Sequence, residues 1–215
     1  MSYWRCRRFA AALAVVCLAA GCARPSSPAV TVGTAAQLRD GDIVFQAARS
    51  PQSEAIRRAT HSPYTHCGMV FIVNGDTRVL EAIEPVCWTP YRDWVARGEE
   101  GQAAHRRLRE ADRVLTPAVT GRMRALGERW LGKQYDYYFE WSDDKLYCSE
   151  LVYKLYERAA GIKPGAVQKL GDFDLDDFVV RRALRQRYGS AIPIDETVIA
   201  PADLFAAEQF ITVTE

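Results

Sequence analysis

The chain has 215 residues, 48% of them hydrophobic, which is enough to bury one sizeable core. Its 28 basic and 27 acidic residues nearly balance, so no charge of one sign favours nucleic acid as a partner. We therefore expect one folded domain and exclude nucleic-acid binding.

The N-terminus has the form of an export signal, because three arginines precede an apolar run from Phe9 to Ala20 that is too short to span a bilayer. Small residues then lead into Cys22, and this junction resembles the lipobox of bacterial lipoproteins, whose cysteine is lipidated. We expect residues 1–21 to be removed and Cys22 to carry a lipid anchor. The alternative is a plain secretory peptide cut after a small residue.

Residues 22–35 are rich in Pro, Ser and Ala and predict a flexible tether, which leaves residues 36–215 as the folded domain. With Ala23 after Cys22, the expected location is periplasm-facing, on the outer membrane of a Gram-negative bacterium. Membrane contact is then made through the lipid anchor.

The first predicted elements alternate short strands with helical segments. Gly41–Phe45 is a turn into a strand, 53–60 a helix, and 67–73 a strand whose return partner is 78–83. The Asn74-Gly75 pair between the last two runs is a strong hairpin signal.

The second half is mainly helical. We predict a short helix at 90–97, a strand at 103–109, and a helix at 116–131 that starts with Pro117 and stops at Gly132. An amphipathic helix beginning near Cys148, a basic helix at 179–188 and a strand at 210–213 follow. Because the pattern lacks regular strand–helix–strand alternation, the fold class is α+β.

Three cysteines remain in the domain: Cys67, Cys87 and Cys148. An odd number leaves at least one thiol unpaired. In an oxidising compartment Cys67 could pair with Cys87, which would leave Cys148 free.

Cys148 lies in the first turn of its helix, where free amides and the helix dipole favour thiolate over thiol. His66 opens a strand and can direct its imidazole into a cleft, whereas Cys67 should point to the opposite face and stay out of the site. Glu81 lies in an apolar strand and needs a partner if it is buried, and imidazole would serve. These three residues therefore form a candidate Cys-His-acid nucleophilic site.

Each residue also has a structural interpretation. Cys148 could be a small buried hydrophobic residue, His66 could be solvated, and Glu81 could face solvent on an edge strand. A zinc site is disfavoured because the chain has no close ligand pair such as Cys-x-x-Cys. We expect neither a metal nor another cofactor.

Several tracts together resemble the YiiX/YaeF-like family, circularly permuted relatives of NlpC-type papain-fold amidases and of lecithin retinol acyltransferase. The order is histidine, acid, cysteine, carried by Thr65–Met69, Glu81 and Tyr147–Val152. The other matching tracts are Gly41–Phe45, Leu131–Asp136, Trp141–Asp144, Phe173–Leu175 and Ile192–Val198. Cys67 departs from the family pattern, in which a small residue without a thiol is more usual.

This resemblance implies a small antiparallel sheet or half-barrel packed against helices, with the nucleophile at a helix N-terminus. It implies Cys148 as nucleophile, His66 as base and Glu81 as orienting acid. Tyr147, Tyr135 and Asp42 are candidates for substrate or oxyanion contacts, although Asp42 is better explained as a turn-pinning residue.

The expected function is cleavage of an amide bond, such as one in cell-wall peptides, through an acyl-enzyme. One alternative is a lipid-directed acyltransferase, lipase or thioesterase that uses the same triad on an ester or acyl amide. Another is a ligand-binding module without turnover. The sequence does not identify the substrate or the oligomeric state.

Overall fold

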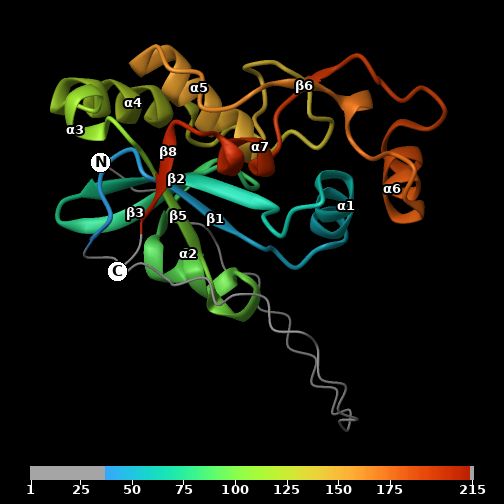
Figure 1. The fold of residues 1–215 in the computed structure, drawn as a ribbon, viewed down its shortest axis with the longest axis horizontal. Helices are drawn as coiled ribbons and strands as arrows, with labels where there is room; N and C mark the ends of the chain where they lie inside the picture. The colour runs from blue at the N-terminus through green and yellow to red at the C-terminus, as the bar shows by residue number, and fades with distance from the viewer. Residues whose placement is uncertain (1–36, 214–215) are drawn as a thin grey trace, which may run out of the picture.

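Apolar residues that alternate along short strands build a six-stranded antiparallel sheet, which organises the protein (Figure 1). We describe residues 37–213 from a computed structural model. The strands lie in the order β4-β3-β2-β1-β5-β8. Their bounds are β1 (Ile43–Gln46), β2 (His66–Val73), β3 (Asp76–Glu81), β4 (Cys87–Pro90), β5 (Ala104–Leu108) and β8 (Phe210–Thr212).

The β2–β3 hairpin sets the register of the sheet. Val73 pairs with Asp76 across a two-residue turn in which Asn74 and Gly75 both have positive φ, 54° and 84°. Asn-Gly is favoured in such turns because neither residue resists this conformation strongly. The expected hairpin is therefore present, and it brings the end of β3 back beside the start of β2.

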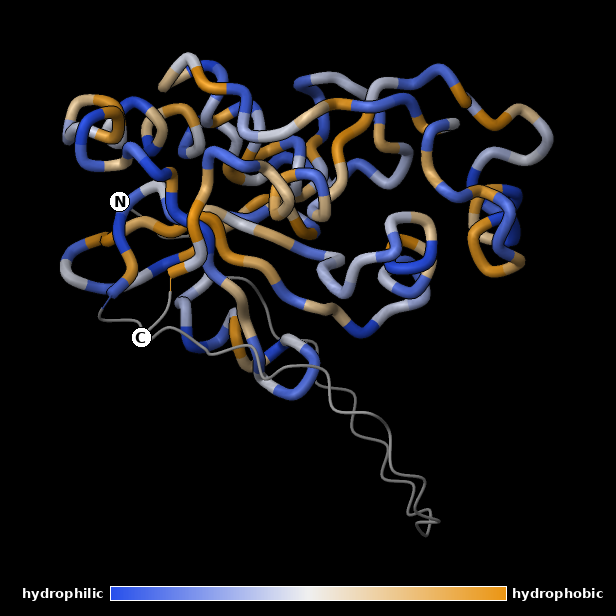
Figure 2. Tube along the Cα trace, viewed as in Figure 1, coloured by the Kyte–Doolittle hydropathy of each residue, from blue (hydrophilic) through white to orange (hydrophobic). Residues whose placement is uncertain are grey.

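One face of the sheet packs against helices α4 (Pro117–Trp130) and α5 (Cys148–Ala160), which lie above the strands in Figure 1. Ile43, Phe45 and Met69 from the sheet contact the apolar stripe of α5 in the main core. Two further helices, α3 (Ala111–Val114) and α7 (Pro201–Ala206), border this layer. In Figure 2 the central strands are mostly coloured as apolar, as burial requires.

The opposite face is covered by helix α2 (Tyr91–Arg97), drawn below the strands in Figure 1. Trp94 is completely buried there against Val44, Val70 and Val79. A 3-10 turn, η2 (Glu99–Gly101), follows this helix.

A smaller apolar cluster lies at one end of the molecule, where α1 (Pro51–Thr60) and α6 (Phe178–Tyr188) are drawn near each other. Leu170, Val180, Leu184 and Val198 form its buried centre. The two-stranded sheet of β6 (Gln168–Lys169) and β7 (Thr197–Val198), together with η3 (Leu170–Asp172), completes this region. The end of the main sheet carrying His66 therefore adjoins a second group of helices.

The predicted class and most predicted elements are confirmed, with boundaries within a few residues. Five of the described helices and strands had no sequence prediction: β4, β6, β7, α3 and α7. Four of them have four residues or fewer, so a periodic pattern cannot develop within them.

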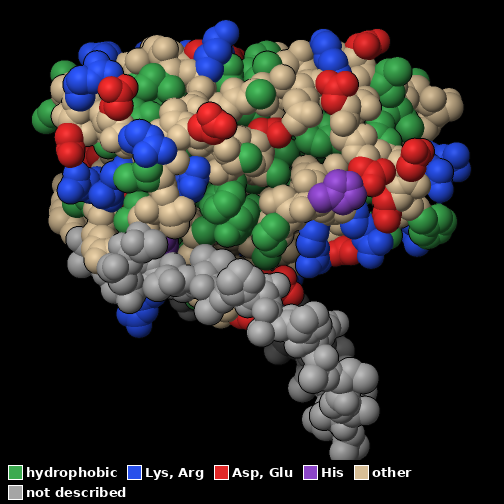
Figure 3. Space-filling view, in the orientation of Figure 1, with side chains coloured by type: hydrophobic (Ala, Val, Ile, Leu, Met, Phe, Trp, Pro, Cys, Tyr) green, Lys and Arg blue, Asp and Glu red, His purple; other side chains and the backbone are tan. Residues whose placement is uncertain are grey.

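The expected signal peptide, tether and Cys22 anchor lie outside the described residues. None of the helices within residues 37–213 is long and apolar enough to cross a membrane. On the face drawn in Figure 3, basic and acidic side chains are interspersed.

Candidate active site

Cys148 is the first residue of α5, and the sequence around it explains why the helix begins there. Tyr147 has extended backbone angles, and its N–H donates to the Glu150 carboxylate at 3.3 Å. Glu150 is also paired with the buried Lys154 at 2.6 Å. Lys154 in turn bonds Asp143 at 2.8 Å, so one cation fixes the preceding loop to the helix start.

His66 and Glu81 are brought together by the hairpin. His66 opens β2, Glu81 ends β3, and Nε2 of the imidazole lies 2.6 Å from Oε2 of the carboxylate. Glu81 is fully buried, so the partner expected for a carboxylate in an apolar strand is present. With Nε2 occupied, Nδ1 is the ring nitrogen that remains for Cys148.

Three residues that the sequence did not single out support this pair. Thr89 and Arg97 both donate to Oε1 of Glu81, the oxygen not used by His66. The Trp94 ring stacks on His66, with centroids 6.0 Å apart and planes inclined by 27°. The only sequence signal for Thr89 is its position on an adjoining strand, and that strand was too short to predict.

The electrostatics of the site favour a thiolate and an imidazolium. The Cys67 thiol and the His66 ring hydrogen-bond with Cys148 and hold the pKa of Cys148 well below its ordinary value, despite burial. Burial alone would lower the pKa of His66, but hydrogen bonds with Cys148 and Glu81 raise it to about 9. Burial also opposes ionisation of Glu81, yet its bond to His66 and the charges of His66 and Arg97 keep its pKa below the usual range.

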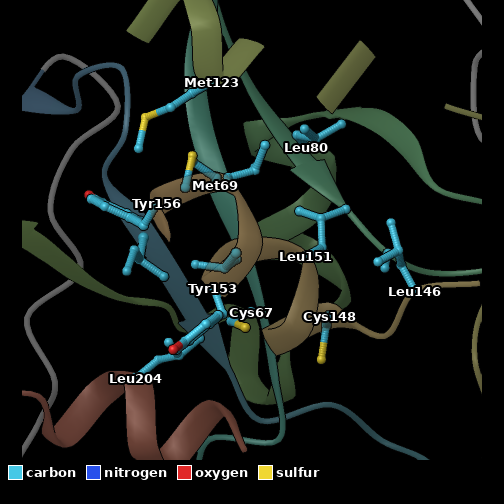
Figure 4. Packing of buried hydrophobic residues seen from close by; sticks show 14 of the residues in the cluster. Cys67, Met69, Leu80, Met123, Leu146, Cys148, Leu151, Tyr153, Tyr156 and Leu204 are labelled. Carbon is cyan, nitrogen blue, oxygen red and sulfur yellow. The ribbon is translucent and has the colours of Figure 1, made fainter. Parts of the chain in front are cut away.

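Cys67 contradicts the prediction that it would lie outside the site. The strand alternation is as expected, since Cys67 faces the main core while His66 stacks on Trp94 at the other face. However, α5 begins close to the end of β2, so the Cys148 sulfur interacts with side chains from both faces. Figure 4 shows Cys67 on its strand beside the helix that starts at Cys148.

The proposed Cys67–Cys87 disulfide is also wrong, because Cys67 is a free thiol in the structure. Burial and its interaction with Cys148 hold the pKa of Cys67 well above the ordinary value. Cys67 is therefore a neutral S–H donor next to the candidate nucleophile.

Tyr135 and Tyr147 both line a pocket that reaches Cys148. The Tyr135 hydroxyl accepts a hydrogen bond from Nε2 of Gln52 at 3.0 Å, and burial holds its pKa well above the usual range. It therefore keeps its proton and can donate it. The Tyr147 hydroxyl instead accepts from the Ile199 N–H at 3.2 Å, so this ring braces the helix start against the segment before α7.

Asp42 lies apart from the triad. It precedes β1, whereas His66 pairs with Gln46 at the other end of that strand. Arg107 forms two hydrogen bonds to its carboxylate, at 2.8 and 2.6 Å, and the Arg39 N–H forms a third at 2.9 Å. These hydrogen bonds hold Asp42 in the turn before β1, at the end of the strand away from His66.

Comparison with known proteins gives two close relatives from Escherichia coli. The uncharacterized protein YiiX of strain K12 is 44% identical over 179 residues, covering 83% of this chain and 87% of YiiX. A crystal structure described as the metalloprotein yiiX from Escherichia coli O157:H7 superposes with a TM-score of 0.79 at 44% identity. That alignment covers 83% of this chain and 98% of the other.

A metal ion does not fit the site described above. Within residues 37–213, no group of three or more His, Cys, Asp and Glu side chains is placed to hold one. Both oxygens of Glu81 are occupied by His66, Thr89 and Arg97.

The sequence profile of the permuted papain-like amidase enzymes, the YaeF/YiiX or C92 family, matches residues 37–214. This span includes the whole sheet, the α5 helix and the Cys148, His66 and Glu81 arrangement. The chain belongs to this permuted papain-like amidase family and is a cysteine-dependent hydrolase of the amidase and peptidase class.

Proposed function

We propose that this protein hydrolyses an amide bond through an acyl-enzyme on Cys148, with His66 as acid and base and Glu81 as the group that orients the imidazole. The observation that carries the proposal is the buried His66–Glu81 hydrogen bond of 2.6 Å beside a cysteine whose pKa is lowered. A positioned base next to a helix N-terminal thiol is the arrangement that nucleophilic acyl transfer requires.

In the first half of the reaction, the Cys148 thiolate attacks the amide carbon and the carbonyl oxygen takes the negative charge. The protonated His66 then donates its proton to the amide nitrogen, the C–N bond breaks and the amine leaves. In the second half, neutral His66 takes a proton from water, which attacks the thioester. The acid product leaves and Cys148 returns to a thiolate beside protonated His66.

Two donors are suited to the oxyanion. The Cys148 N–H is in the first turn of α5 and has no partner within the helix. The Tyr135 hydroxyl lines the same pocket and retains its proton. Donors fixed in a buried site stabilise a developing charge strongly.

A second candidate function is favoured by the pocket itself, whose lining is mainly apolar. Ile56, Phe139, Leu184 and Ile199 are among the side chains on its walls. Such a surface binds an acyl chain more favourably than a polar peptide. Lipid-directed acyl transfer or hydrolysis by the same triad therefore remains the alternative, and cell-wall peptides remain a substrate to be tested.

The protein is proposed to act outside the cytoplasm. The lipobox-like junction supports export and a lipid anchor on Cys22, with residues 22–35 as the tether. This location would place the pocket at a membrane surface facing the periplasm.

The test is to incubate the purified mature domain with cell-wall peptides and with N-acyl amides and to measure product release. Cys148→Ala should abolish turnover, and an acyl adduct should be trapped on Cys148 of the unmodified protein by mass spectrometry. Cys67→Ala serves as the mapping control, because the adduct should stay on Cys148. Transfer of the acyl group to a second acceptor would select the acyltransferase alternative, and ligand binding with no turnover by either protein would select the binding module.

A further inference from the structure

The pocket beside Cys148 has a distinctive chemical composition. Its walls come from α1, α6, the aromatic segment after α4 and the strand β7, and Cys148 lies on its surface. Two of its polar side chains donate hydrogen bonds to backbone carbonyls: Thr60 to the Ile56 carbonyl at 2.8 Å and Ser149 to the Ile199 carbonyl at 2.7 Å. The protons of both hydroxyls are therefore used in hydrogen bonds within the fold.

Arg187 is different. Among the described residues that line the pocket, it alone has a formal charge at neutral pH other than the Cys148 thiolate. Its guanidinium lies over the Phe139 ring, 4.7 Å from the centroid, and donates to Oε1 of Gln52 at 3.0 Å. The apolar pocket thus contains one cation held in a defined orientation.

The position of this cation is linked to the nucleophile through two side chains. Gln52 accepts from Arg187 and donates to Tyr135, and all three line the pocket with Cys148. The Tyr135 hydroxyl is influenced by the charges of both Cys148 and Arg187. A substrate that reaches the sulfur therefore passes within the field of the guanidinium.

Given the amide hydrolysis proposed above, on which this step rests, we propose that Arg187 binds a carboxylate of the substrate while the apolar walls bind its hydrocarbon part. A guanidinium has five N–H donors in a planar fork, and a carboxylate matches two of them. The surrounding apolar walls make the local environment less polar than water, which strengthens this pairing. The substrate class is an amphipathic acyl amide bearing a carboxylate, of which N-acyl amino acids are the simplest.

Two matched substrates test the proposal, N-lauroylglycine and N-lauroylglycinamide, which differ only in a carboxylate or a neutral carboxamide. The unmodified protein should have a kcat/KM about 10- to 100-fold higher for the carboxylate, the range expected for a charge-assisted Arg–carboxylate contact. Arg187→Gln should remove this preference mainly through KM, and Arg187→Lys should restore part of it. Arg185→Gln is the matched control, because Arg185 lies on the same helix, is exposed and does not line the pocket.

Binding keeps this test separate from the proposed reaction. In the Cys148→Ala background, isothermal titration should show tighter binding of N-lauroylglycine than of its amide, and loss of that difference with Arg187→Gln. Equal binding and equal kcat/KM for the two compounds, or the same change with Arg185→Gln, would overturn the role of Arg187. A carboxylate preference in binding without any hydrolysis would retain Arg187 and reject the proposed reaction.

Discussion

Glu81 is a completely buried carboxylate whose two oxygens have different partners. Oε2 holds the His66 ring and Oε1 is held by Thr89 and Arg97. Thr89 and Arg97 hold the carboxylate in place, and the carboxylate in turn orients the imidazole. The charge of Glu81 is therefore available to stabilise protonated His66.

Glu81→Gln should lower kcat by about 10²- to 10⁴-fold, because an amide in place of the carboxylate no longer selects the correct imidazole tautomer. It should also shift the pH profile. In the unmodified protein the rate should fall as pH rises through about 9, where His66 loses its proton. Without the carboxylate this pKa decreases, so the alkaline fall should begin at lower pH. Rate profiles between pH 5 and 10 measure this shift, with Glu128→Gln, a substitution at an exposed position, as the control. An unchanged alkaline limb in Glu81→Gln would contradict the prediction.

Cys67 supports the thiolate from the other side of the nucleophile. Removing this S–H donor in Cys67→Ala should raise the pKa of Cys148, and Cys67→Ser should preserve much of the effect because a hydroxyl also donates. The rate of iodoacetamide alkylation of Cys148 as a function of pH is the measurement. Identical alkylation profiles for the alanine variant and the unmodified protein would show that Cys67 has no electrostatic role.

His105 provides a second buried imidazole, on β5, whose Nε2 lies 2.7 Å from the Tyr91 hydroxyl. Burial lowers its pKa to about 4, so the unfolded chain binds a proton that the folded protein does not between pH 6.5 and 4. Stability should therefore fall by about 3 kcal/mol as pH decreases through this window. Urea unfolding at pH 6.5 and pH 4 should show a smaller decrease for His105→Gln than for the unmodified protein. His61→Gln, at an exposed position, should retain the full decrease.

At the scale of elements, α4 approaches the sheet closely at Gly127. A Cβ at Gly127 would lie 2.2 Å from Cδ2 of the buried Leu80 and 3.6 Å from Cδ2 of Leu155, so either the Leu80 side chain or the helix would have to shift. Gly121 is in the same helix, and a Cβ there would meet nothing within 4 Å.

These two glycines give a matched prediction. Gly127→Ala should decrease the free energy of unfolding by about 1–3 kcal/mol through overpacking. Gly121→Ala should increase it by about 0.5–1 kcal/mol, because alanine is the better helix former. Denaturant unfolding of both variants checks the pair, and destabilisation by both to a similar degree would reject the packing explanation.

The elements that could be predicted were those with a long pattern or a strong turn signal. The 3.6-residue stripe of α5 and the Asn74-Gly75 turn are local properties of the sequence, so they needed no tertiary information. Strand β4 and the contacts of Thr89 and Arg97 with Glu81 depend on how distant segments pack. The error at Cys67 has the same origin, since strand alternation was correct but the position of α5 was not available.

At the scale of the whole molecule, the family resemblance predicted the fold and class that the comparisons confirm. The lipobox-like junction at Cys22 gives a prediction about location. Cys22→Ala should release the protein from the membrane fraction and abolish incorporation of labelled palmitate. Amide hydrolysis by the released protein should persist, because the folded domain is intact. Membrane retention and unaltered labelling of the variant would contradict lipidation at Cys22.

The proposed active site is assembled from two separate parts of the chain, with the imidazole and carboxylate in the first hairpin and the sulfur 82 residues after His66 (148 − 66). At ribosomal rates of about 5–20 residues per second, the sulfur is synthesised about 4 to 16 seconds later than the imidazole. Until α5 docks on the sheet, this sulfur lacks the neighbours that ionise it. The sulfur is therefore the last of the three groups to be synthesised, and its ionisation has to wait until both halves of the chain have folded together.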